Sequence, residues 1–68
     1  MVNEPKIDIV MLRLREVMGI TGLARSTIYK LVNEGVFPKP VKLSTRAVAW
    51  RSDHLREWIQ QRQSWEAA

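Results

Sequence analysis

The sequence predicts a small, mainly helical α+β domain that contains three helices and a two-stranded β-hairpin. Three observations lead to this prediction. Apolar residues recur at helical spacing in three stretches. Before the last of these, two short stretches alternate apolar with small or polar residues. Glycines and prolines fall between the predicted elements. At 68 residues the chain is long enough for one domain only, and such a domain hides about 60% of its surface on folding.

The first helix is predicted from Leu14, Val17 and Met18, which recur at i, i+3 and i+4. It is expected to run for about two turns and to end at Gly19, where a glycine-containing turn begins. Before it, residues 9–12 form either a short extended segment or an apolar cover for the core. Residues 1–8 are expected to be disordered or frayed.

Residues 25–34 form the best-defined predicted helix. Its apolar face is marked by Ile28, Leu31 and Val32. Gly35 is placed to end this helix, and Pro38 prevents its continuation. Its start is weak, because Ala24 stands where serine, threonine, aspartate or asparagine would cap best.

A hairpin and a third helix complete the predicted domain, which spans residues 9–63. Residues 41–43 and 48–50 alternate apolar with small or polar side chains, as two half-buried strands do. Residues 44–47 join them. Ser52 is the expected N-cap of the last helix, and Asp53 suits its first turn. The buried stripe of this helix is expected to consist of Leu55, Trp58 and Ile59. Residues 64–68 are expected to form a tail.

Composition excludes several classes of protein. With 46% hydrophobic and 26% charged residues, the chain is too apolar for intrinsic disorder. It has no cysteine, which excludes disulfides and thiolate metal sites. The longest apolar run, residues 9–12, is far shorter than the about 20 residues that span a membrane, and the first residues lack a signal pattern. We therefore expect a cytoplasmic protein.

Positive charge is confined to the middle of the chain. The formal net charge is +4 and the sequence pI is near 10.1. Residues 25–51 carry six basic side chains against one acidic side chain, whereas the parts before and after are neutral or slightly acidic. A basic patch on a small domain indicates a polyanionic partner, and a merely solubilising surface is the other interpretation.

Two helices joined by a short glycine-containing turn predict a helix-turn-helix, and the hairpin after them predicts a wing. A DNA major groove is about 12 Å wide and accepts one helix, whose first turn presents free N–H groups to phosphates. Arginine suits guanine, while hydroxyls and lysine suit phosphates. The candidate DNA-binding residues are therefore Arg25, Ser26, Thr27, Tyr29, Lys30, Lys42 and Arg46.

Several of these residues also have a structural interpretation. Arg25 is either a DNA contact or a solvated charge, and Ser26 either binds phosphate or assists the weak cap. Tyr29 either stacks on the DNA backbone or lies over the edge of the core. Arg46 is placed at the wing tip for a backbone or minor-groove contact.

The remaining aromatic and titratable residues do not indicate catalysis. Trp50 and Trp58 lie in apolar stripes and are expected in the core, whereas Trp65 either packs back on the domain or contacts a partner. His54 is the sole histidine and has no carboxylate cluster near it, so no metal site is expected. No nucleophile is paired with a base, and no glycine-rich phosphate loop precedes a helix. We expect no enzymatic activity and no cofactor.

The residues themselves resemble a known family. The runs Leu12–Val17 and Thr21–Leu31 are similar to the AlpA family of prophage regulators, as are Gly35–Leu43 and Arg46–Trp50. The similarity covers roughly residues 11–62, with the segments in the family's order and spacing. It implies a small MerR-like winged helix-turn-helix that regulates transcription, and some members act as excision factors that direct a site-specific recombinase.

The leading hypothesis is a sequence-specific regulator of phage or prophage type that binds double-stranded DNA. Its second helix would enter the major groove, and its hairpin would grip the flanking backbone. The closest alternative is an excisionase, or recombination directionality factor, for a site-specific integrase. A different class of alternative is a protein-interaction module that binds an acidic partner.

The expected partners follow from this hypothesis. They are double-stranded DNA and, beside it, a second copy on tandem sites, a recombinase or an RNA polymerase subunit. No membrane and no small-molecule substrate are expected, and the protein would be associated with the nucleoid in the cytoplasm.

Overall fold

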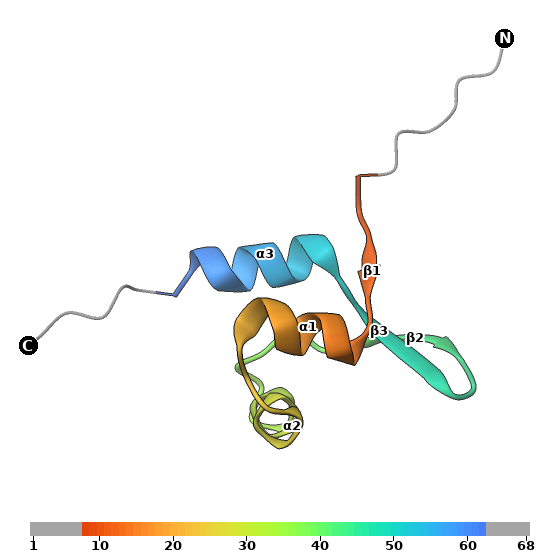
Figure 1. The fold of residues 1–68 in the computed structure, drawn as a ribbon, viewed down its shortest axis with the longest axis horizontal. Helices are drawn as coiled ribbons and strands as arrows, with labels where there is room; N and C mark the ends of the chain where they lie inside the picture. Colours follow the sequence, from red (N-terminus) through yellow and green to blue (C-terminus); the bar gives the residue numbers. More distant parts are fainter. Residues whose placement is uncertain (1–7, 63–68) are drawn as a thin grey trace, which may run out of the picture.

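The computed structural model describes residues 8–62. Its elements are β1 (Met11–Leu12), α1 (Leu14–Thr21), α2 (Arg25–Asn33), β2 (Val41–Ser44), β3 (Ala47–Arg51) and α3 (Ser52–Gln60). In Figure 1, α1 lies between α3 and α2, α2 is seen end-on, and the β2–β3 hairpin projects from the body. The predicted fold of three helices with a hairpin wing is confirmed. The expectations for residues 1–8, for the tail at residues 64–68 and for Trp65 fall, apart from Asp8, outside the described range.

The sheet has three strands rather than the predicted two. Its order is β1-β3-β2, and both pairings are antiparallel. β1 pairs Met11 with Arg51 and Leu12 with Trp50. The segment before the first helix is therefore extended, and its pairing makes β3 the central strand.

Ser52 ties the first strand to the last helix, and the prediction that it caps α3 is wrong. Arg51 occupies the N-cap position, and Ser52 is the first helical residue. The Ser52 hydroxyl accepts a hydrogen bond from the Val10 N–H at 2.8 Å, and the Ser52 N–H donates to the Val10 carbonyl at 2.8 Å. This reciprocal pair continues the β1–β3 ladder into the helix, so the hydroxyl serves a distant strand instead of the local helix end.

The first helix runs past Gly19, where the sequence predicted its end. Gly19 keeps a negative φ, and a Cβ added there would meet nothing within 4 Å, so it is simply an open position on the helix. The helix ends instead before Gly22, whose φ is +76° and whose N–H donates to the Met18 carbonyl at 2.7 Å. The Thr21 hydroxyl secures this end by donating to the Val17 carbonyl at 2.8 Å.

The second helix agrees with its prediction to within one residue. α2 ends at Asn33, and Gly35 follows in a left-handed conformation with a φ of +78°. Ile28 is fully buried, while Leu31 and Val32 pack against the core from the same face. The helical period therefore predicted correctly which side of α2 is turned away from solvent.

The core draws side chains from every helix, the linker before the hairpin and the central strand. Its buried members are Val17, Ile28, Phe37, Ala49, Trp50 and Leu55. Trp50 is fully buried, as predicted. β2 is exposed at all four positions, so the prediction that it is half-buried is wrong. The reason is visible in Figure 1, where this edge strand belongs to the hairpin that projects from the body.

The apolar stripe of α3 is narrower than predicted. Leu55 is buried, but Trp58 is only half-buried and Ile59 is 41% exposed. Trp58 packs against the edge of the core and meets Phe37 edge-on, with ring centroids 4.6 Å apart. Phe37 fills this position because the linker after α2 turns its aromatic side chain inward, where only 4% of it is exposed.

Replacing Trp50 is expected to unfold the domain. Truncating a buried tryptophan costs about 3–5 kcal/mol, and the whole stability of a typical domain is only about 5–15 kcal/mol. Trp50→Ala should therefore be largely unfolded at room temperature by far-UV circular dichroism. The half-buried Trp58 supplies the control, because Trp58→Ala should remain folded under the same conditions. A Trp50→Ala variant that melts like the wild type would contradict this account of the core.

Candidate nucleic-acid interface

The outward face of α2 presents most of the predicted contact residues together. Ser26, Tyr29 and Lys30 lie at i, i+3 and i+4 and are exposed, and so is Arg25 in the first turn. Thr27 differs, since it is half-buried and lies off this face. The structure therefore brings four of the five α2 candidates to the accessible side of the helix.

The N-terminal end of α2 has no side-chain cap. Ala24 adopts the extended conformation of an N-cap residue, with a φ of −77° and a ψ of 160°, but supplies no acceptor. The first turn also contains no acidic residue. Because the first N–H groups of a helix lack intrahelical partners, this end of α2 suits an anionic group.

One basic residue of the wing, Lys42, lies on the sheet face that meets α2. Lys42 in β2 pairs with Val48, so both side chains lie on the same face of the sheet as Trp50, two residues further along β3. Trp50 in turn contacts Tyr29 of α2, with ring centroids 6.2 Å apart. Lys42 therefore lies on the sheet face that is turned toward α2. Arg46 is exposed in the turn between the two wing strands.

The position of Tyr29 agrees with the structural interpretation given for it, and the proposed DNA contact stays a prediction. Its ring is tilted by 56° against the buried Trp50 ring, and 38% of the residue is exposed. It therefore lies over the edge of the core while remaining accessible from the outer face of α2.

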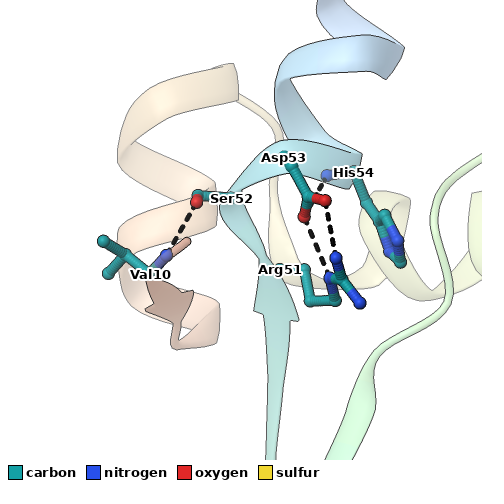
Figure 2. Close-up of polar contacts among 5 residues, drawn as sticks. All are labelled: Val10, Arg51, Ser52, Asp53 and His54. Atoms are coloured by element: carbon teal, nitrogen blue, oxygen red, sulfur yellow. Dashed lines mark hydrogen bonds and ion pairs between the residues drawn. The ribbon is translucent and has the colours of Figure 1, made fainter. Parts of the chain in front are cut away.

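Arg51 is held by a carboxylate, unlike the other basic residues of this region. Its Nε donates to Asp53 Oδ1 at 3.0 Å and its Nη2 to Asp53 Oδ2 at 2.7 Å, while Asp53 also accepts the His54 N–H (Figure 2). This bidentate hydrogen bonding with Arg51 lowers the pKa of Asp53 to about 2 and raises the pKa of Arg51. Among residues 8–62 this is the sole ion pair, so the charges of Arg25, Lys30, Lys42 and Arg46 are available to a partner.

The described part of the chain offers little for other chemistry. Residues 8–62 contain no group of three histidine, cysteine or acidic side chains that could hold a metal ion. No helix in this range is long and apolar enough to cross a membrane.

The fold and this surface define a protein of the winged helix-turn-helix class. Residues 10–63 match the family described as the prophage CP4-57 regulatory protein, AlpA, and the chain belongs to this family. The resemblance seen in the sequence is therefore confirmed. As a member of a regulatory-protein family, the chain is a regulator and not an enzyme.

Two relatives show how far the similarity extends. The chain is 46% identical over 48 residues to the uncharacterized protein ORF88 of Enterobacteria phage P4, covering 71% of this chain and 54% of that protein. It is 39% identical over 57 residues to the DNA-binding transcriptional activator AlpA of Escherichia coli strain K12, covering 75% of this chain and 81% of that protein. The chain thus spans about half the length of the phage relative and most of the bacterial one.

The Arg51–Asp53 pair predicts an acid-sensitive contribution to stability. The pKa of Asp53 is lowered from 3.8 to about 2 in the folded state, so the pair stabilises the fold fully above about pH 5. This contribution should disappear as the pH falls from about 5 to about 2. Asp53→Asn should therefore melt below the wild type by a constant margin between pH 5 and 7, and the margin should close near pH 2. Thermal melts of both proteins from pH 2 to 7 measure this difference in melting temperature. A difference that does not change with pH would contradict the lowered pKa of Asp53.

Proposed function

We propose that this protein binds duplex DNA in a sequence-specific manner as a transcriptional regulator of prophage type, acting in the cytoplasm at the nucleoid. In this proposal α2 enters the major groove, and the wing holds the flanking backbone. Arg25 contacts a base. Phosphates are bound by four residues, which are Ser26, Thr27, Lys30 and Lys42. Tyr29 packs on the sugar–phosphate backbone, and Arg46 contacts the backbone or the minor groove.

One observation carries the proposal more than any other. The exposed face of α2 and the lysine of β2 lie on the same side of the sheet, linked by the Tyr29–Trp50 contact at 6.2 Å. A reading helix and a wing on one side of a small domain are the arrangement with which such domains grip a duplex. The bacterial relative named as a DNA-binding transcriptional activator supports the same function.

Selection from a random duplex pool is the direct experiment. An enriched sequence that maps to the source genome would establish the target, and footprinting would then place it. A protected promoter supports transcriptional regulation, whereas repeated protected sites beside a recombination junction would identify an excision factor. Selection that enriches no sequence would reject specific binding to DNA.

Salt dependence tests whether the exposed charges meet phosphates. Outside the Arg51 pair, five basic residues lie between positions 25 and 51, and these are Arg25, Lys30, Lys39, Lys42 and Arg46. If about five phosphates are neutralised, log affinity should fall with log salt at a slope of about −4 to −5. Fluorescence anisotropy titrations at several salt concentrations measure the slope. A slope near zero would remove the DNA-binding proposal.

Alanine variants at two arginines separate base reading from backbone grip. Arg25→Ala should weaken binding to the selected sequence by about 1–3 kcal/mol and relax preference at one base position. Arg46→Ala should weaken selected and random duplexes alike and make the salt slope shallower by about one. The same titrations on both duplexes compare the variants. Equal, sequence-independent losses from both would assign Arg25 to phosphate.

A further inference from the structure

The linker between α2 and β2, residues 34–40, begins with a rigid helix-ending motif. The Gly35 N–H donates to the Val32 carbonyl and the Val36 N–H to the Leu31 carbonyl, each at 3.0 Å. With Gly35 at a φ of +78°, these two bonds form a Schellman motif. The direction in which the chain leaves α2 is therefore defined by backbone bonds.

Two tryptophan indoles bind the next carbonyls of this linker. Trp58 Nε1 donates to the Val36 carbonyl at 2.7 Å, and Trp50 Nε1 donates to the Pro38 carbonyl at 2.8 Å. Between these two carbonyls, Phe37 is buried and meets the Trp58 ring edge-on. The linker is thus held from α3 at one point and from β3 at another.

The helix that carries Trp58 is a direct continuation of the wing. β3 ends at Arg51 and α3 begins at Ser52, with no loop between them. The junction is braced by the Arg51–Asp53 pair on one side and by the Val10–Ser52 hydrogen bond on the other (Figure 2). The wing and α3 are therefore joined directly, with contacts on both sides of the junction.

We propose that α3 is a strut, that is, a helix that holds the wing and α2 at a fixed spacing. Trp58 is the positioning residue that joins this helix to the end of α2. The path runs from the wing through β3 into α3, then across the Trp58–Val36 hydrogen bond to the end of α2. The strut sets the spacing between the reading helix and the wing. The functional part of this inference rests on the proposed function, because that spacing matters only when both elements engage one duplex.

Trp58 can be altered without opening the core, which makes the strut testable. The residue is half-buried between Phe37 and the Arg62 guanidinium, which lies 4.5 Å from the centre of the Trp58 ring. Trp58→Phe keeps an aromatic ring there and removes the N–H donor. Losing one hydrogen bond in a domain of this size should lower the melting temperature by about 4–8 °C and leave the fold intact at 25 °C.

A distance measurement tests the strut without DNA. The chain has no native cysteine, so Asn33→Cys on α2 and Thr45→Cys in the wing turn accept a unique pair of spin labels. Trp58→Phe should broaden or displace the distance distribution measured by double electron–electron resonance. Leu14→Ala is the control, since it removes a partly buried side chain of α1 outside the strut and should leave the distribution unchanged. A Trp58→Phe distribution identical to that of the parent would overturn the inference.

A double-mutant cycle then tests the effect of the strut on DNA binding. Trp58→Phe should weaken binding to the selected sequence about tenfold and random-duplex binding by less, because only the selected sequence fixes the reading helix while the wing grips. In an Arg46→Ala background the further loss should shrink to about twofold or less, because the wing grip that needs alignment is already gone. Equal losses in both backgrounds would refute the positioning role. A wild type without duplex preference, combined with the expected distance result, would reject the proposed function and still support the strut.

Discussion

The burial of one indole ring holds the parts of this domain together. Trp50 lies fully buried in the central strand, its ring meets Tyr29 of α2, and its N–H binds the Pro38 carbonyl of the linker. A chain of 68 residues buries few large side chains, so one tryptophan that contacts sheet, helix and linker carries an unusual share of the packing. The Trp50–Tyr29 contact therefore joins α2 directly to a strand of the wing, beside the connection that α3 provides.

Features that local signals define were predictable from the sequence. The exposed and buried faces of α2 follow from helical period, and its end follows from Gly35 and Pro38, as the structure confirms. The candidate residues on that helix are exposed in the structure, apart from Thr27. Such predictions succeed because period, capping and turn chemistry act within a few residues of one another.

Features that depend on distant partners were not predictable. The two-residue strand β1 has no period of its own, and its pairing partner Arg51 lies forty residues away from Met11. Ser52 has the local chemistry of a cap, yet its hydroxyl binds Val10 across the sheet. The burial of Trp58 on α3 differs from the prediction for a similar reason, since the ring beside it is that of Phe37 in the distant linker. The Arg51–Asp53 pair joins the last residue of β3 to the second residue of α3, so it depends on the abrupt change from strand to helix at this point.

The side chains proposed to meet DNA take no part in the polar bonds of the fold. Within residues 8–62, Arg25, Lys30, Lys42 and Arg46 form no side-chain hydrogen bond or ion pair with another residue. Surface side chains of this kind contribute little to the free energy of unfolding, typically within about 0.5 kcal/mol on substitution. The chemistry presented to a partner can therefore change while the core stays the same.

The residues that hold the fold together differ from these surface residues, because replacing them changes the stability of the domain. Trp50, Phe37 and Trp58 are not proposed to touch DNA, but they hold together the elements that carry the charged side chains. Recognition and stability thus rest on separate sets of side chains. The two sets meet at Tyr29, whose ring packs on Trp50 while 38% of the residue remains exposed on the face of α2. A change at this position would alter both the surface offered to a partner and the contact that aligns it.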